Sequence, residues 1–242
     1  MKILNLGCGH KVSAHPDVIN IDWSMYLRMR SSLILSALAP LFLQGERRKR
    51  FEKLPGNILL HDLSRGIPFP DCSVDVIFHS NMLEHLDRSS AEKFLSEALR
   101  VLKPGGIHRV VVPDFECACG AYLAHIEECE HNPRARSQHD DFIGLVLEQS
   151  VRREAVGTSL QPPFWRFIEN ALLGDARSRG ETHQWMYDRI SLDNLLRRVG
   201  YHDIKLMRFD TSSIQGWGQL GLDTHVDGSE YAPGSLYMEA RK

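Results

Sequence analysis

The sequence lacks the features of several protein classes. Its 242 residues include only five cysteines, an odd number at irregular spacing, which excludes a small disulfide-stapled domain. Basic and acidic side chains nearly cancel, at 29 against 31, so a generally basic nucleic-acid-binding protein is not expected. No apolar run reaches the roughly 17–25 residues that a membrane-spanning helix needs. Ordinary fractions of hydrophobic (43%) and charged (25%) residues remain, and they predict a folded globular protein.

The cysteines give little sign of metal binding. Cys117-x-Cys119 precedes His125, Cys129 and His131, but this spacing matches neither a zinc finger nor a CxxC pair, so no metal is expected. The sequence opens directly on strand-like residues, with no secretory signal before them. We therefore expect reduced thiols and a cytoplasmic protein.

Short apolar runs alternate with helical patterns, which predicts an α/β fold around a mostly parallel sheet. The predicted strands are Ile3–Leu6, Val18–Ile21, Ile58–Leu60, Val74–Phe78, Ile107–Val112, Ile204–Phe209 and Ser235–Ala240. Helices are predicted over Ser89–Leu102 and over Leu192–Val199, the second with Ser191 as N-cap and Gly200 as its end.

Two stretches interrupt this alternation. We expect one domain over residues 1–242, with insertions at 24–56 and 130–182. The later insertion contains helical patterns near Asp140–Ala155 and Phe164–Leu173, broken by Pro162-Pro163, and we expect it to cap the ligand edge of the sheet.

A glycine turn follows the first predicted strand. In Leu4-Asn5-Leu6-Gly7-Cys8-Gly9-His10, the two glycines allow a tight turn and close approach of a ligand to the backbone. The carboxyl end of this strand lies where open parallel sheets bind ligands. A dinucleotide fingerprint needs a third glycine at position 12, where Val12 stands, so pyrophosphate binding is not expected.

The next strands each end in polar groups. The second ends at Asp22 and the third is followed by Asp62, while Ser80 and Asn81 follow the fourth. Taken singly, each acid is best interpreted as a solvated carboxylate at a strand end. Taken with the glycine turn, an acid after the second strand suits two ribose hydroxyls, and one after the third suits an adenine amino group.

This ordered set resembles the class I S-adenosylmethionine-dependent methyltransferases, and looks most like a bacterial subgroup often associated with surface-polysaccharide synthesis. The resemblance covers Lys2 to Asp114 and continues through His183–Asp188 and Ser235–Ala240. It implies a Rossmann-like, doubly wound, seven-stranded sheet with an antiparallel last strand. Few residues separate the glycine turn from the second strand, so the usual first helix must be short or missing.

The resemblance also implies the roles of individual residues toward S-adenosylmethionine. Gly7 and Gly9 would lie against its methionine and ribose part, and Asp22 would bind the ribose hydroxyls. The other expected contacts are the adenine ring for Asp62 and the Leu63 amide, and the methionine end for Ser80 and Asn81.

Methyl transfer to a hydroxyl benefits from a general base, and histidine suits that task near neutral pH. His85 and His183 are the leading candidates, followed by Asp114, and His79 also lies at a strand end. The alternatives are that His85 only holds its loop, that His183 caps the following turn, and that Asp114 only binds the acceptor.

Aromatic side chains suggest the acceptor. Trp185 and Tyr187 are expected to cover the apolar face of a sugar, although plain core filling is the alternative for each. The leading hypothesis is O-methylation of a sugar in a polysaccharide, its lipid-linked precursor or a glycolipid. A small-molecule biosynthetic methyltransferase and a non-catalytic cofactor-binding module remain as alternatives.

The 24–56 insertion carries seven basic and two acidic side chains around the apolar stretch Leu33–Leu43. One alternative is a helix packed over the cofactor or against a second subunit of a homodimer. The other is an interfacial segment in peripheral contact with anionic membrane at its inner face.

Overall fold

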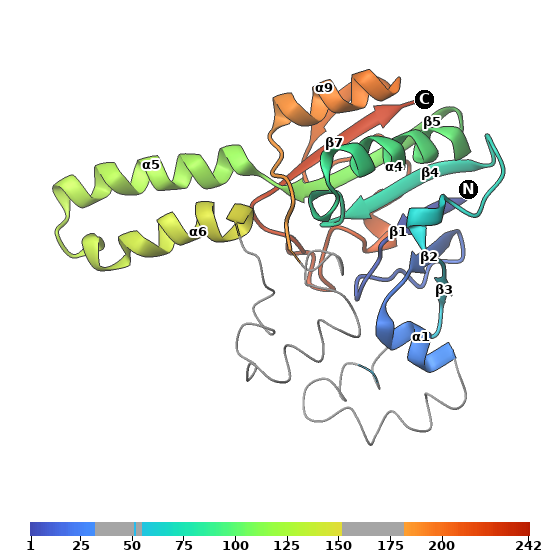
Figure 1. Cartoon of the computed structure of the whole chain (residues 1–242), viewed down its shortest axis with the longest axis horizontal. Coiled ribbons are helices and arrows are strands. Elements are labelled where there is room, and N and C mark those ends of the chain that lie inside the picture. Colours follow the sequence, from blue (N-terminus) through green and yellow to red (C-terminus); the bar gives the residue numbers. More distant parts are fainter. Residues whose placement is uncertain (32–50, 52–54, 152–181) are drawn as a thin grey trace.

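Seven strands form one sheet in the order β3-β2-β1-β4-β5-β7-β6 (Figure 1). The computed structural model describes residues 1–31, 51, 55–151 and 182–242. The strands are β1 (Ile3–Leu6), β2 (Val18–Asp22), β3 (Ile58–Leu60), β4 (Val74–Ser80), β5 (Leu102–Pro113), β6 (His202–Met207) and β7 (Ser235–Arg241). The apolar runs therefore predicted every strand of the sheet, with ends that shift by a few residues.

Strand direction agrees with the expected fold class. The first five strands pair in parallel from β3 to β5, and β7 pairs antiparallel with both β5 and β6. All four residues of β1 are buried, as the near-continuous apolar composition of a central parallel strand requires. The Rossmann-like, doubly wound α/β assignment is thus confirmed, including the antiparallel last strand.

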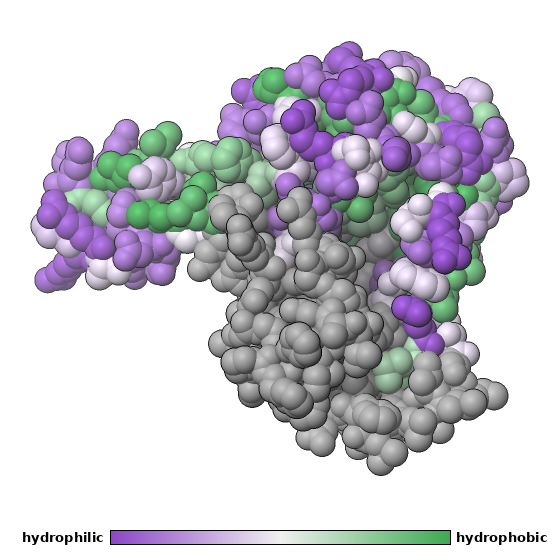
Figure 2. Space-filling model, viewed as in Figure 1, coloured by the Kyte–Doolittle hydropathy of each residue, from purple (hydrophilic) through white to green (hydrophobic). Residues whose placement is uncertain are grey.

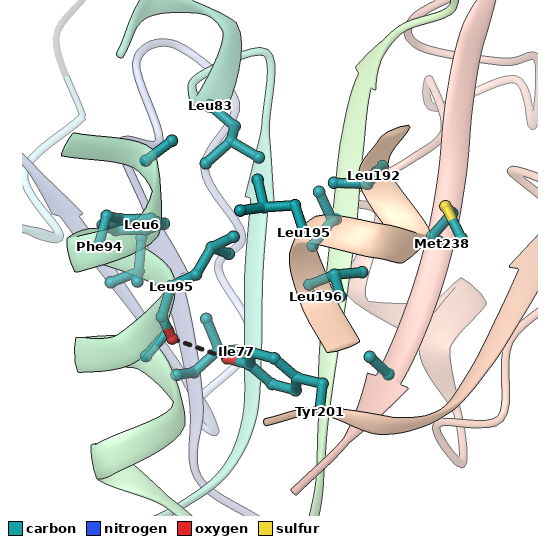
Figure 3. Close-up of a cluster of buried hydrophobic side chains, with 14 of the residues drawn as sticks. Leu6, Ile77, Leu83, Phe94, Leu95, Leu192, Leu195, Leu196, Tyr201 and Met238 are labelled. Carbon is teal, nitrogen blue, oxygen red and sulfur yellow. Dashed lines mark hydrogen bonds between the residues drawn. The ribbon is translucent and has the colours of Figure 1, made fainter. Parts of the chain in front are cut away.

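One face of the sheet is covered by α4 (Arg88–Val101) and α9 (Arg189–Val199). Figure 3 shows Leu95 of α4 and Leu196 of α9 pointing into one apolar cluster with Ile77 of β4. The hydroxyl of Tyr201 donates a hydrogen bond to the Leu95 carbonyl at 3.2 Å, tying the two helices together within this cluster. This cluster packs both helices against the sheet.

The start of α9 differs from the prediction. Asp188, not Ser191, is the N-cap, because the Asp188 carboxylate accepts from the Ile190 and Ser191 amides. The Ser191 hydroxyl in turn accepts from the Asp188 amide at 3.0 Å, which completes a capping box. Gly200 ends the helix in the left-handed conformation, as predicted.

The other face of the sheet is covered by an irregular segment that includes the 3-10 helix η4 (Trp217–Leu220). Trp217 packs edge-on against Phe78 of β4, with ring centroids 5.1 Å apart. Beside it, the fully buried Arg109 of β5 forms ion pairs with Asp223 at 2.7 Å and with Glu239 of β7 at 2.8 Å. An ionic group thus lies inside an otherwise apolar layer.

An arm of two helices, α5 (Phe115–His131) and α6 (His139–Val151), follows β5 and projects away from the sheet (Figure 1). The 3-10 helix η3 (Ala135–Gln138) joins them at the tip. The helical pattern near Asp140 is confirmed by α6, whereas α5 was not predicted. Hydrophobic side chains are exposed on this arm, among them Leu123, Leu145 and Leu147 (Figure 2).

Between the glycine turn and β2 the chain forms no helix, as the short spacing implies. The buried side chain of Asn5 donates to the Lys11 carbonyl at 2.8 Å and to the Asn20 side chain at 2.9 Å, which fixes this connection.

Much of the two insertions lies outside the described residues, including Leu33–Leu43, Pro162-Pro163 and Phe164–Leu173. The described start of the first insertion is α1 (Met25–Ser31), with Arg28 and Arg30 in its last turn. Within the described residues, no helix is long and apolar enough to cross a membrane. The packed and interfacial alternatives for Leu33–Leu43 stay predictions.

Candidate functional site

The glycine turn and Asp22 meet at the carboxyl edge of the sheet. Gly7 and Gly9 have φ angles of +61° and +50°, in the region that favours glycine. A Cβ at Gly7 would lie 2.7 Å from Met82 Sδ, whereas a Cβ at Gly9 would have no neighbour within 4 Å. The positive φ favours glycine at both positions, a Cβ at Gly7 would displace the Met82 side chain, and the backbone at position 9 faces open space.

Asp22 is directed at the same turn. Burial raises the pKa of its carboxyl, and hydrogen bonds from the Trp23 and Gly9 amides act in the opposite direction. The Trp23 amide donates to the carboxylate at 2.7 Å. A partly buried carboxylate beside exposed glycine backbone suits a ligand that brings two hydroxyl donors, so these residues fit the ribose of S-adenosylmethionine.

Asp62 and Leu63 lie one strand away from Asp22. The His61 amide donates to the Asp22 carbonyl at 3.2 Å, which holds the ends of β2 and β3 together. Asp62 caps the 3-10 helix η1 (Leu63–Arg65) and accepts from the Ser64 amide and hydroxyl, which lowers the pKa of its carboxyl. The carboxylate is thus held ionised in a fixed orientation at the expected adenine position.

Ser80 ends β4, and Asn81 follows it with a φ of +50°, a conformation that is uncommon outside glycine. The Asn81 amide donates to the Val111 carbonyl of β5 at 3.0 Å. All of the predicted cofactor residues therefore lie at the ends of β1, β2, β3 and β4, along one edge of the sheet.

A cleft of about 510 Å³ opens beside Asn81. Its polar lining consists of Asn81, Glu84, His85, Asp114, His183 and Ser235, and its apolar lining includes Pro113, Ala118, Leu145, Met186 and Pro233. The first turns of α5 and Leu145 of α6 form one wall, and the expectation that the 130–182 insertion caps the ligand edge stays a prediction. The cleft gathers all three candidate bases, although they come from distant parts of the sequence.

Glu84 is the centre of a cluster with the two histidines. It lies in the 3-10 helix η2 (Leu83–His85) after β4, with its carboxylate almost completely buried. His85 Nε2 lies 3.8 Å and His183 Nε2 lies 4.0 Å from the same carboxylate oxygen, Glu84 Oε1. The Glu84 carbonyl accepts from the Gln184 amide at 2.7 Å, which brings the segment after residue 182 onto η2.

The electrostatics of this cluster favour the neutral form of the His85 imidazole. Burial raises the pKa of the Glu84 carboxyl to about 8, and burial lowers the pKa of His85. With the His85 Nδ1–H donating to the Thr182 carbonyl at 3.3 Å, the lone pair lies on Nε2. A neutral imidazole with a fixed tautomer can accept a proton from a hydroxyl in the cleft.

Sequence reasoning gave Glu84 no role. The available signal was the position of Glu84 within the stretch Met82-Leu83-Glu84-His85-Leu86. An acid among apolar residues tends to be buried with them, and buried acids are rare unless they have a partner.

The structure separates the other histidine candidate from the cleft. His79 has no exposed surface, and its ring packs edge-on against Phe94 at 5.3 Å and His108 at 5.0 Å. Burial lowers its pKa to about 3. His79 is therefore a core residue beneath α4. Asp114 does line the cleft, where it also caps α5 by accepting from the Glu116 amide at 3.0 Å.

The expected aromatic pair lies elsewhere. Trp185 and Tyr187 line a second hollow of about 230 Å³ against α9, and the Arg88 guanidinium lies 4.7 Å from the Trp185 ring centre. Met186, between them, lines the cleft instead, because neighbouring residues of an extended segment point to opposite sides. Trp185 and Tyr187 thus do not line the cleft beside Asn81, and their expected contact with the acceptor stays a prediction.

Comparison with known proteins agrees with this arrangement. Residues 18–110 match the sequence model of a family described as "Methyltransferase domain". A probable S-adenosylmethionine-dependent methyltransferase from Mycolicibacterium smegmatis is 44% identical over 48 residues. That alignment covers 20% of this chain and 18% of the relative.

Solved structures with a similar arrangement include S-adenosylmethionine-dependent methyltransferases from Archaeoglobus fulgidus (13% identity, TM-score 0.44) and Mesorhizobium loti (15% identity, TM-score 0.43). The matches cover all of this chain and 86% and 90% of those chains, respectively. Because these TM-scores are low, the solved structures carry no further argument about this chain. Residues 18–110 are similar to a methyltransferase domain, and a 48-residue stretch of the chain is similar to part of a probable S-adenosylmethionine-dependent methyltransferase.

Proposed function

We propose that this methyltransferase-domain protein transfers a methyl group from S-adenosylmethionine to a hydroxyl of a sugar, in a polysaccharide, its lipid-linked precursor or a glycolipid. The observation that carries the proposal is the position of His85, His183 and Asp114 around one cleft, beside the strand ends that carry the predicted cofactor residues. Positioning and proton acceptance are the two tasks that such a transfer leaves to the protein.

The cofactor supplies a methyl group on a sulfonium, whose leaving group is a neutral thioether. The chain must then align the acceptor oxygen and remove its proton as the oxygen–carbon bond forms. His85 is the favoured proton acceptor, because its Nδ1 is turned to the Thr182 carbonyl and its Nε2 lone pair faces the cluster in the cleft. Asn81 and Asp114 are placed to hydrogen-bond further hydroxyls of the acceptor.

Glu84 acts as a positioning residue in this scheme. As a carboxylate it can stabilise the His85 imidazolium after proton transfer, when Nε2 carries a proton that it can donate to Glu84. The distance of 3.8 Å between His85 Nε2 and Glu84 Oε1 leaves room for this contact to shorten during the reaction.

A polyhydroxylated acceptor is supported by the polar lining of the cleft rather than by stacking aromatics. Five of its side chains can donate or accept hydrogen bonds to hydroxyls: Asn81, His85, Asp114, His183 and Ser235. The apolar residues opposite, Leu145 and Met186 among them, suit the carbon face of a sugar ring.

The test is product detection. The purified protein is incubated with S-adenosylmethionine and three acceptor panels: oligosaccharides, glycolipids with lipid-linked sugars, and non-sugar metabolites. Methylated product is identified by mass spectrometry. A methylated sugar is expected. A methylated non-sugar would establish the small-molecule alternative, and cofactor binding without any product from a broad panel would establish the non-catalytic module.

A further inference from the structure

The arm formed by α5 and α6 has an unusual interior. Among the 17 residues of α5, the one buried residue is a histidine, His125. Its ring stacks on Phe142 of α6 with centroids 3.9 Å apart and an interplanar angle of 19°. An apolar residue is the usual occupant of such a position, because a buried imidazole loses its hydration. The position therefore requires partners for the ring nitrogens.

Those partners are metal-ligating groups. His125 Nδ1 lies 3.1 Å from His139 Nδ1 and 3.5 Å from Cys129 Sγ. Zinc bond lengths of about 2.0–2.1 Å to nitrogen and about 2.3 Å to sulfur, at tetrahedral angles, separate two nitrogens by about 3.3 Å and a nitrogen from a sulfur by about 3.6 Å. Both separations from His125 Nδ1 are thus close to those that one tetrahedral ion imposes, and all three donor atoms lie within 4.8 Å of one another.

The backbone explains how these donors meet. His125 and Cys129 are four residues apart on α5, so they share one face of the helix. His139 is the first residue of α6, directly after the turn at the tip of the arm. The ring of His139 lies against Tyr122, with centroids 5.7 Å apart, and is parallel to within 15° to the ring of His125.

We propose that His125, Cys129 and His139 bind a borderline-soft divalent metal ion, with Zn²⁺ as its natural occupant, and that this ion ties α5 to α6. Two imidazoles and one thiolate form a donor set that such ions prefer over Mg²⁺ or Ca²⁺. Binding removes the Cys129 thiol proton to solvent and leaves a fourth position for water. The ion stabilises an arm that buries little apolar surface of its own.

The sequence pattern that argued against a metal included His125 and Cys129 but not His139. Cys117 and Cys119 lie eight and six residues before His125 on α5, and the imidazole of His131 is directed at the Glu127 carbonyl at 2.8 Å. The third ligand comes instead from His139, beyond the turn, where no fixed sequence spacing would point to it.

A second metal-ligating cluster lies in the cleft, formed by Glu84, His85 and His183. Its oxygen–nitrogen separations of 3.8 and 4.0 Å exceed the about 3.4 Å that tetrahedral geometry gives for oxygen and nitrogen ligands. The arm cluster is therefore the better preformed of the two, and the experiment has to distinguish them.

The experiment measures metal content and cobalt spectra of the full chain. Protein stripped with a chelator is re-equilibrated with Zn²⁺ or Co²⁺, dialysed and analysed by mass spectrometry for metal and by absorption. The wild type is expected to retain one ion per chain, and its cobalt form to show a thiolate charge-transfer band. Cys129→Ser and His139→Ala should weaken binding by more than about 100-fold, beyond the effect of outer-shell substitutions.

Matched controls lie on the same helix and in the other cluster. Cys117→Ser and His131→Ala should retain the ion and the band. Glu84→Gln should do so as well, because it alters only the cluster in the cleft. The proposal is overturned if the wild type binds no ion, or if Glu84→Gln abolishes binding while Cys129→Ser keeps it. Circular dichroism of each variant verifies that the fold is intact.

Discussion

The rings of His85 and His183 meet edge to face, with centroids 4.8 Å apart, although they come from opposite halves of the chain. Both direct Nε2 toward the same oxygen of Glu84. Two imidazoles that share one buried acid behave as a unit, so the protonation of one changes the basicity of the other.

Replacing His85 with alanine should lower turnover by roughly 10²–10⁴-fold, the usual effect of losing a general base. His183→Ala should have a smaller effect, because the Thr182 carbonyl fixes the tautomer of His85 and not of His183. Turnover is measured with the methylated product, and cofactor affinity by calorimetry, which should be unchanged in both variants. His202→Ala, on the outer strand β6, is the control. Full turnover in both active-site variants would mean that no imidazole acts as the base.

The buried Glu84 should make stability depend on pH. Its pKa is raised from 4.5 to about 8, so the unfolded chain loses this proton at lower pH than the folded chain. Between about pH 5 and 8 the free energy of unfolding should therefore fall as pH rises. At pH 8 the burial of Glu84 lowers the free energy of unfolding by several kcal/mol, at about 1.4 kcal/mol for each pKa unit.

Glu84→Gln removes this penalty. The gain in unfolding free energy over wild type should increase from pH 5 to pH 8, as measured by urea denaturation at several pH values. The lowered pKa of His85 has the opposite effect on stability, because it reduces the free energy of unfolding at pH values below the ordinary pKa of histidine. This effect is present in both wild type and Glu84→Gln. Glu127→Gln, the same substitution at an exposed position of α5, is the control. Parallel pH curves for wild type and Glu84→Gln would show that the carboxyl is ionised in the folded state.

Asp22→Ala should weaken binding of S-adenosylmethionine or its demethylated product by about 1.5–3 kcal/mol, the value of hydrogen bonds to a charged group. This corresponds to roughly a 10–150-fold higher dissociation constant in calorimetry. Asp17→Ala makes the same charge change just before β2, where Asp17 pairs with the amino terminus, and should leave affinity intact. Equal affinities for all three proteins would remove Asp22 from the ribose site.

Arg109→Met should destabilise the protein by about 3–5 kcal/mol, because it leaves Asp223 and Glu239 buried without their cation. Arg208→Met breaks an exposed pair with Asp210 and should cost at most about 1 kcal/mol. Denaturant unfolding compares both variants with wild type. Similar small losses would mean that water or rearrangement compensates the two buried acids.

The sheet could be predicted because its strands are short, nearly continuous apolar runs. Ile3–Leu6 was predicted with the bounds that the structure shows, since a buried central strand leaves little choice of end. The start of α9 was missed because Asp188 and Ser191 can both cap, and only the capping box decides between them. Helix α5 was missed because one buried histidine gives no apolar stripe.

The candidate site was predicted unevenly. Gly7, Gly9 and Asp22 could be placed because strand ends in a parallel sheet converge on one edge. His85 and His183 could be proposed for the same site from their places in the sequence. The position of Glu84 between them could not, because it depends on the contact of the segment after residue 182 with η2. The position of Trp185 and Tyr187 against α9 could not be predicted, because packing sets the direction of a side chain in an irregular segment.

The place of β7 in the sheet has a consequence for how the protein is made. β7 lies between β5 and β6, so β6 has only β7 as a neighbour in the described sheet. Because the chain is synthesised from its amino terminus, β5 and β6 leave the ribosome before β7. The edges of β5 and β6 that pair with β7 therefore stay unpaired until β7, which ends at Arg241, has left the exit tunnel. Nascent chains stalled before β7 should therefore expose strand edges to chaperones, and the last part of the sheet should close only after its synthesis.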